Sequence, residues 1–200
     1  MKRPKKALFS VYGKTLAFDD LVRQFHRRGF EIIASGGTYK HIESSLGLCV
    51  TDTARITGLD PVLDHRVATL CPSLHGGLLA DEVLHMKELD RLGWPFIDAV
   101  VCTFYPLLKA MEEKHDDPVA INNMVDIGGP CLIRSACKGG RLVVVDEHDY
   151  EWVAKKLNSH RGSMSPDGKS ARWLRAKAVS TITAYVAAEA VFRNNLTRPD

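Results

Sequence analysis

Short apolar runs alternate with amphipathic stretches along most of the chain, and this alternation is the feature that most constrains its fold. The run at 97–104 contains DAVVCTF and suits a strand that is buried on both faces at the centre of a sheet. Strands that alternate with helices predict an α/β fold with a parallel sheet. We expect strands at 7–11, 30–34, 48–51, 97–104 and 141–145. We expect helices at 18–28, from the turn at 35–38 to about 46, and at 74–80, 82–92, 107–114, 119–124, 131–137, 150–157 and 171–194, with most of 52–72 in a loop.

The length of 200 residues is typical of one domain with a terminal extension. Residues 158–170 are rich in Ser, Gly and Pro, which indicates a linker between a domain at 1–157 and a C-terminal helix within 171–200. Apolar residues recur at helical spacing in that helix, at Leu174, Ala178, Ile182, Tyr185, Ala188 and Phe192. We therefore expect the helix to pack on the domain or on a dimer partner.

Charge and cysteine usage exclude several classes of protein. Removing the four basic residues among the first six from the net charge of +3 leaves −1, so we expect a solvated basic tail and no nucleic-acid surface. The four are Lys2, Arg3, Lys5 and Lys6. The cysteines are odd in number and lack a C-x-x-C pair, which favours reduced thiols in a cytoplasmic protein. They are Cys49, Cys71, Cys102, Cys131 and Cys137. No apolar run approaches 18 residues, so we expect no contact with a membrane.

A turn of the sequence SGGT, at 35–38, follows the expected strand 30–34 and opens a helix. Glycines let a ligand approach the backbone closely, and the N–H groups at a helix start attract an anion. Lys14 follows the first strand, and the carboxyl ends of parallel strands meet at one edge of a sheet. The turn is therefore either a phosphate cradle with Lys14 as counter-charge or only a tight connection.

A second turn, DIGGP at 126–130, precedes the helix expected at 131–137. Its N–H groups either hold a carbonyl or oxyanion or simply cap that helix. Four polar side chains are expected to crowd this end of the sheet, namely Arg66, Tyr105, Asp126 and Lys138. A buried Lys138 close to Asp126 and Tyr105 would have a shifted pKa and could serve as acid or base, although a structural role stays open for each of them.

Six short motifs occur in a fixed order. They are SGGT at 35–38, R-V-x-T-L-x-P at 66–72, H-G-G-L-L-A at 75–80, F-Y-P at 104–106, D-I-G-G-P at 126–130 and R-S-A-x-K at 134–138. Together they resemble the IMP cyclohydrolase domain of the bifunctional purine biosynthesis enzyme, over about residues 7–157 and with a matching tail helix. The resemblance implies a methylglyoxal-synthase-like fold, which is a Rossmann-type parallel sheet flanked by helices.

The resemblance also implies an activity. The family closes the ring of 5-formamidoimidazole-4-carboxamide ribotide (FAICAR), with loss of water, to give IMP in the last step of purine biosynthesis. It uses no metal and no organic cofactor, and it usually forms homodimers. The transformylase domain of the bifunctional enzyme has no counterpart in these 200 residues, so we expect a separate formyltransferase upstream.

Site residues follow from the same resemblance and from the two turns. The resemblance assigns catalysis to Tyr105, Asp126 and Lys138. Substrate binding is expected from Ser10, Lys14, Ser35, Gly36, Gly37, Thr38, Arg66, Thr69, Ile127, Gly128 and Gly129.

The chain departs from the family pattern at five positions near these residues. Ala68 and Cys71 stand where the family usually has lysine and histidine, Tyr12 and Gly13 replace a serine and a carboxylate, and Thr103 replaces an asparagine. Loss of the lysine predicts weaker stabilisation of an oxyanion. Two alternatives therefore stay open beside the enzyme: a non-catalytic nucleotide- or phosphate-binding regulatory domain of the same fold, and a methylglyoxal synthase.

Overall fold

Five short parallel strands form one sheet in the order β3-β2-β1-β4-β5. The computed structural model describes residues 3–60, 62–63, 67–114, 116–159, 164–165 and 167–197. The strands are β1 (Lys5–Ser10), β2 (Phe30–Ala34), β3 (Val50–Asp52), β4 (Ala99–Cys102) and β5 (Leu142–Val144). The predicted parallel α/β fold is confirmed, and each of these strands overlaps one expected from the sequence.

The strand order reverses at β1. From β1 the chain builds outward to β2 and β3 on one side, and then returns to add β4 and β5 on the other. The carboxyl ends of β1 and β4 lie side by side, since Ser10 pairs with Cys102. Such a reversal opens a crevice beyond the carboxyl ends of the strands, which is where open α/β sheets bind their ligands.

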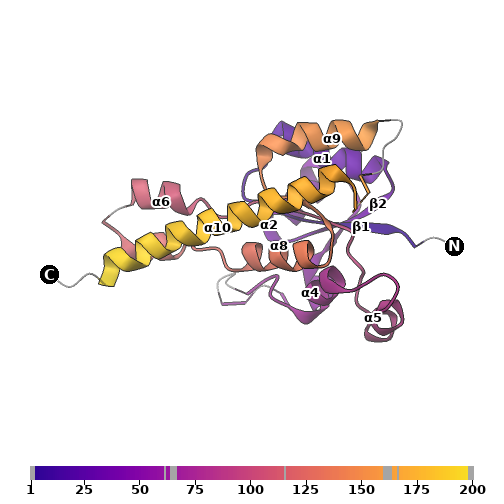
Figure 1. Ribbon diagram of the computed structural model, residues 1–200, viewed down its shortest axis with the longest axis horizontal. Helices are drawn as coiled ribbons and strands as arrows, with labels where there is room; N and C mark the ends of the chain where they lie inside the picture. The colour runs from indigo at the N-terminus through magenta and orange to yellow at the C-terminus, as the bar shows by residue number, and fades with distance from the viewer. Residues whose placement is uncertain are drawn as a thin grey trace.

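Helices cover both faces of the sheet (Figure 1). On one face, Ala7 and Phe9 of β1 pack against α1 (Leu16–Arg27) and α9 (Tyr150–Asn158). On the other face lie Leu8 of β1 and the helices α4 (Pro72–Leu79) and α8 (Gly128–Lys138). The side chains of Ala7, Leu8 and Phe9 are fully buried, which explains the unbroken apolar runs in the sequence. The remaining helices are α2 (Gly36–Leu46), α3 (Thr53–Thr57), α5 (Met86–Leu92), α6 (Leu107–Glu113), α7 (Pro118–Asn122), a 3-10 turn η1 (Glu147–Asp149) and α10 (Lys169–Thr197).

The long helix α10 runs along the molecule from the side of α9 to α6, and the C-terminus lies at the opposite end from the N-terminus (Figure 1). Its residue Leu174 joins the core on one face of the sheet and Ala178 joins the core on the other. Phe192 then packs with Leu107 and Ile121 beyond the sheet. Among the described residues, no helix is both long and apolar enough to cross a membrane.

Capping by side chains explains most differences from the expected helices. The segment 52–72, expected to be mainly loop, contains α3, because Asp52 accepts a hydrogen bond from the N–H of Ala54 at 3.1 Å and starts a helix. The helix expected at 82–92 begins only at 86, since Asp81 accepts from the N–H groups of Val83 and Leu84 and holds a turn there. Of the expected linker at 158–170, residues 160–163 and 166 lie outside the described residues, and α10 already begins at 169.

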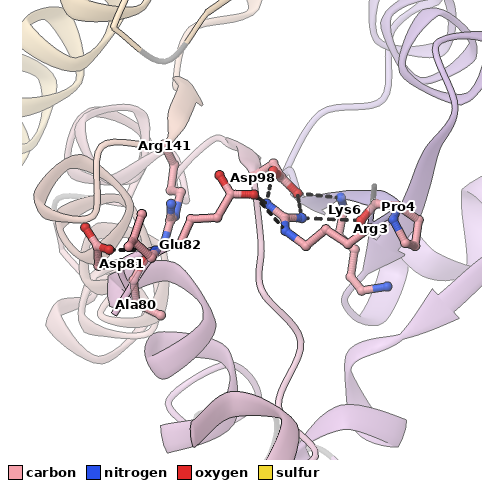
Figure 2. Close-up of polar contacts among 9 residues, drawn as sticks. Arg3, Pro4, Lys6, Ala80, Asp81, Glu82, Asp98 and Arg141 are labelled. Carbon is pink, nitrogen blue, oxygen red and sulfur yellow. Dashed lines mark hydrogen bonds and ion pairs between the residues drawn. The ribbon is translucent and has the colours of Figure 1, made fainter. Parts of the chain in front are cut away.

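The expectation of a solvated basic tail is wrong for Arg3. Its guanidinium forms two hydrogen bonds with the carboxylate of Asp98, at 2.6 and 2.8 Å, and a third with Glu82 (Figure 2). Asp98 also accepts from the N–H of Lys6 at 2.8 Å. A bidentate guanidinium–carboxylate pair is specific in geometry, and here it fastens the start of β1 to the start of β4.

Arg141, just before β5, extends this network at the amino ends of the strands. It donates to the backbone carbonyls of Leu78 and Ala80, and its buried guanidinium lies 3.9 Å from the ring centre of Phe96. Arg3 lies 4.0 Å from the same ring. Burial lowers the pKa of Arg141 to about 10. These contacts tie the amino ends of the strands together, whereas the carboxyl ends of the strands carry the pocket described next.

Candidate functional site

A pocket of about 680 Å³ lies beyond the carboxyl ends of β1, β2 and β4. Five segments far apart in the sequence line it, namely 10–14, 35–38, 68–70, 103–105 and 122–129. Its volume lies within the range of about 300–1,000 Å³ that is usual for small-molecule sites. The convergence of the loops that follow these strands agrees with the reversal of strand order at β1.

The SGGT turn forms the start of α2 and one wall of the pocket. Gly36 has φ +45, in the left-handed region that favours glycine. Ser35 donates its hydroxyl hydrogen to Ser10 at 2.8 Å, and within the described chain no side chain caps α2. The first N–H groups of this helix therefore stay available to an anion in the pocket.

Thr38, predicted to bind substrate, has a different task. Its buried hydroxyl accepts from the N–H of Val11 at 3.0 Å and donates to the carbonyl of Val11 at 3.1 Å. Both bonds hold the loop after β1 against α2. Thr38 thus shapes the cradle rather than offering its hydroxyl to a ligand.

Lys14 places a positive charge over the glycine turn. Its Nζ donates to the carbonyl of Tyr12 at 2.9 Å and would lie 3.6 Å from a Cβ atom added to Gly37. Desolvation lowers the pKa of Lys14. An anion bound in the cradle would offset that desolvation, because an opposite charge nearby favours the protonated ammonium.

Asp126 lies at the other side of the pocket and is partly buried. Its carboxylate accepts from the N–H of Gly129 at 2.8 Å and from the N–H of Tyr105 at 3.3 Å. Burial raises the pKa of Asp126, although these two hydrogen bonds act in the opposite direction. A carboxyl group with a raised pKa in a pocket suits the transfer of a proton near neutral pH.

The glycines of the second turn make room for this carboxylate. A Cβ on Gly129 would lie 2.9 Å from both Asp126 Oδ2 and Phe104 Cδ1, and a Cβ on Gly128 would lie 2.8 Å from Thr69 Oγ1. Because Gly129 already donates its N–H to Asp126, that N–H is not free to hold an oxyanion. The prediction for Gly129 is therefore wrong in this respect, and the same bond explains why α8 begins at 128 instead of 131.

Two tyrosine rings meet at the pocket. Tyr12 and Tyr105 pack edge to face, with ring centres 5.8 Å apart and planes at 74°. They remain 50% and 42% exposed, so both rings stay open to a planar ligand. Burial and the nearby Asp126 raise the pKa of Tyr105, and its hydroxyl therefore keeps its proton at neutral pH.

The structure separates Lys138 from the other predicted catalytic residues. Lys138 is the last residue of α8, is exposed and does not line the pocket. Since α8 begins at the pocket with Gly128 and rises about 1.5 Å per residue, Lys138 lies about 15 Å further along the helix axis. The expectation of a buried lysine beside Asp126 and Tyr105 is therefore wrong within one chain. Arg66 lies outside the described residues.

The other predicted binding residues do line the pocket: Ser10, Lys14, Ser35, Gly36, Gly37, Thr38, Thr69, Ile127, Gly128 and Gly129. Three residues that depart from the family pattern also line it, namely Tyr12, Ala68 and Thr103. Sequence reasoning gave no role to the remaining lining residues, namely Val11, Leu70, Asn122, Asn123 and Val125. The adjacent asparagines shortly before DIGGP were the available signal, since amide side chains both donate and accept hydrogen bonds. Among the described residues, no group of three or more His, Cys, Asp or Glu side chains could hold a metal ion.

Comparisons with known proteins agree with this architecture. Over 190 residues the chain is 40% identical to the bifunctional purine biosynthesis protein PurH of Clostridium botulinum (strain Loch Maree / Type A3), covering 92% of this chain and 36% of that protein. It is 36% identical over 196 residues to the PurH protein of Bartonella bacilliformis, covering 96% of this chain and 36% of the relative. The chain thus spans about a third of the length of the curated relatives it matches.

A solved structure and a family model complete the comparison. The crystal structure of ForH superposes with a TM-score of 0.81 at 29% sequence identity, covering 98% of this chain and all of that one. Residues 17–131, more than half of the chain, match the model of the MGS-like domain. The chain therefore belongs to the MGS-like domain family.

Proposed function

We propose that this chain is an IMP cyclohydrolase, which closes the ring of FAICAR with loss of water to give IMP in purine biosynthesis. One observation carries the proposal. A single pocket holds the SGGT cradle with Lys14 on one side and the partly buried carboxyl of Asp126 beside Tyr105 on the other. The similarity to PurH proteins supports the choice of a purine nucleotide as the ligand.

The cradle suits the substrate's phosphate. The N–H groups at the start of α2 and the Lys14 ammonium supply positive charge at one place. With the phosphate held there, the rest of the nucleotide extends toward Tyr12, Tyr105 and Asp126 along the pocket. Holding the carboxamide and the formyl group together converts ring closure into a well-oriented intramolecular step.

Ring closure needs a base and an acid. The carboxamide nitrogen forms a bond to the formyl carbon and loses a proton, while the formyl oxygen gains a proton. The nitrogen that carried the formyl group then gives up its proton, the oxygen takes up a proton and leaves as water, and a C=N double bond remains in the ring. Asp126 is the base in this proposal, because burial brings its pKa toward neutral pH, and Tyr105 is the acid, because its hydroxyl stays protonated.

A test compares wild type with Asp126→Asn. FAICAR conversion is followed by absorbance, and IMP binding is measured by calorimetry on the same preparations. We expect the variant to keep IMP affinity within a few-fold while its kcat falls by about 10²–10⁴-fold, the usual range for loss of a general base. Equal turnover by the two proteins would show that Asp126 is not the base.

Lys138 enters the proposal only through a second copy of the chain, because it cannot reach the pocket of its own. The apolar stripe of α10 packs on the chain's own core, so the expected homodimer would use another side of the helix, where Val179 and Val186 are half exposed. Sedimentation at micromolar concentration tests for the dimer. Loss of turnover in Lys138→Ala with unchanged IMP affinity would show that the lysine acts in a neighbouring copy's pocket, and full turnover would remove it from the catalytic set.

A non-catalytic nucleotide sensor is the second candidate, because Ala68 lines the pocket where the resembled family has a lysine. A sensor would bind IMP and release no product from FAICAR. The wild-type assay therefore separates the two functions directly.

A further inference from the structure

Tyr185 of α10 contacts the backbone on both sides of Val125, next to the proposed base. Its Oη accepts a hydrogen bond from the N–H of Asp126 at 2.8 Å and donates one to the carbonyl of Met124 at 3.0 Å. These are main-chain bonds, so they fix the path of the loop and leave the Asp126 carboxylate to its own partners. The side chain of Tyr185 does not line the pocket.

The ring of Tyr185 contacts the second segment of the site. It packs edge to face against Phe104, with ring centres 5.2 Å apart and planes at 68°. Phe104 directly precedes Tyr105, the proposed acid, and approaches the backbone of Gly129 so closely that a Cβ there would lie 2.9 Å from its ring. The side chain of Tyr185 therefore contacts both the loop that carries Asp126 and the residue that precedes Tyr105.

The helix that carries Tyr185 is firmly placed on both sides of it. One turn before, Ile182 is buried in the core beneath the sheet. Two turns after, Phe192 packs with Leu107 and Ile121 in a cluster that Tyr185 also joins. Arg193 reaches the side-chain oxygen of Asn122, a pocket-lining residue, at 2.8 Å. The position of Tyr185 is thus set by Ile182 in the core on one side and by the contacts of Phe192 with α6 and α7 on the other.

We propose that Tyr185 is a positioning residue, which holds Asp126 and Tyr105 at the relative placement that ring closure requires. This inference rests on the proposed function. The two loops already meet at the hydrogen bond from the Tyr105 N–H to Asp126, at 3.3 Å, and a misplacement of about 1 Å in a reacting group can cost about 10²-fold in rate. Tyr185 couples the two loops through one rigid ring and hydroxyl.

Tyr185→Phe tests this assignment, because it removes the hydroxyl and keeps the ring that packs on Phe104. We expect kcat for FAICAR to fall by about 10–100-fold. The affinity for ribose 5-phosphate, which probes the cradle alone, should stay within about twofold of wild type. Ser180→Ala on the same helix is the matched control, since it removes an exposed hydroxyl that donates to the carbonyl of Ala176 within α10. Its kcat should equal that of wild type.

A double variant separates positioning from general structural damage. In an Asp126→Asn background the base is already lost, so adding Tyr185→Phe should reduce kcat no further. Full additivity of the two losses would overturn the inference, because a residue that acts through Asp126 cannot cost as much once Asp126 is gone.

Amide hydrogen exchange gives a readout that does not depend on turnover. Peptides covering 124–129 should exchange faster in Tyr185→Phe than in wild type, while peptides covering α2 should not change. Unchanged exchange at 124–129, or a kcat within twofold of wild type, would overturn the inference. If wild type itself fails to convert FAICAR, the proposed function fails, and faster exchange would then still show that Tyr185 holds the loop.

Discussion

Asp126 is the residue on which the proposed chemistry depends most. Its pKa is raised by burial, whereas an ordinary carboxyl group is ionised well below neutral pH. A base works only when deprotonated, so kcat/KM should fall as the pH drops through this raised pKa. The fall should begin at a higher pH than an unperturbed aspartate would give. A pH–rate profile from pH 4 to 9 measures it, and an acid limb near pH 4 would contradict the assignment.

Tyr12 is one of the pocket residues that depart from the sequence pattern of the resembled family. Its ring is open to a planar ligand beside Tyr105, and an aromatic contact contributes about 0.5–1.5 kcal/mol beyond area burial. Tyr12→Ser should therefore weaken IMP binding by about 3–10-fold, whereas Tyr12→Phe should not.

The control for Tyr12 is ribose 5-phosphate, which lacks the base. Its affinity should be equal in wild type and Tyr12→Ser, as measured by calorimetry. A parallel loss of affinity for both ligands would show that Tyr12 acts on the cradle through Lys14, whose ammonium donates to the Tyr12 carbonyl.

At the scale of elements, the start of α8 is the most demanding piece of packing in the site. Alanine ordinarily favours a helix over glycine by about 1 kcal/mol. At Gly129, however, the added Cβ would lie 2.9 Å from both Asp126 and Phe104. Gly129→Ala should therefore destabilise the fold by about 1–3 kcal/mol, the usual cost of overpacking. Thermal unfolding measures this loss.

Gly13→Ala is the matched control for that prediction. A Cβ at Gly13 would approach only Glu147 Oε2, at 3.9 Å, which is an ordinary contact distance. Its melting temperature should stay within about 1 °C of wild type, in line with a surface change of less than about 0.5 kcal/mol. An equal drop in both variants would show that loss of glycine flexibility, and not the clash, sets the cost.

The sequence predicted elements better than their boundaries. The strand at 30–34 was predicted to the residue, because its apolar run lies between Gly29 and the SGGT turn. The start of α8 was missed. The two glycines of DIGGP suggested a turn, whereas the hydrogen bond from the Gly129 N–H to the Asp126 carboxylate lets the helix begin there. Arg3 looked like part of a tail, because its partner Asp98 is far away in the sequence. Local patterns predict local structure, whereas these contacts depend on the assembled sheet.

The candidate site also has parts that local motifs predict and parts that depend on the assembled fold. The resemblance and the turn chemistry identified both walls of the pocket, since each wall is a short motif at the end of a strand. Tyr185 was expected only as part of an apolar helical stripe, because nothing in its own sequence neighbourhood indicates a bond to residues 124–126. The misplacement of Lys138 had a related cause, since motif spacing does not show how far a helix carries a residue from the pocket.

At the scale of the whole molecule, the amino ends of the strands contribute to stability, whereas their carboxyl ends carry the candidate site. The Arg3–Asp98 pair ties the amino ends of β1 and β4, about 20 Å from the pocket along strand β1. Asp98→Asn should lower stability by about 1–2 kcal/mol, since it weakens hydrogen bonds to a charged group that is partly exposed. For a chain of this size, that corresponds to a melting temperature lower by about 2–8 °C.

The same variant should convert FAICAR at the wild-type rate below its melting temperature, because the pocket lies at the opposite edge. The melting temperature is measured in low and in high salt, because salt screens the partly exposed Arg3–Asp98 pair. High salt should therefore reduce the difference between the variant and wild type. If turnover fell in proportion to stability, the amino ends of the strands would be coupled to the pocket through the sheet, and their separate roles would be disproved.

In the proposed function, one pocket both binds a purine ribonucleotide and closes its ring. Purified wild-type protein is mixed with FAICAR, and IMP formation is compared with an enzyme-free control. IMP binding is measured by calorimetry on the same preparation. We expect saturable turnover that exceeds the uncatalysed rate and is inhibited by IMP. IMP binding without turnover above the control would contradict it, and would identify the chain as a nucleotide-binding domain that has no cyclohydrolase activity.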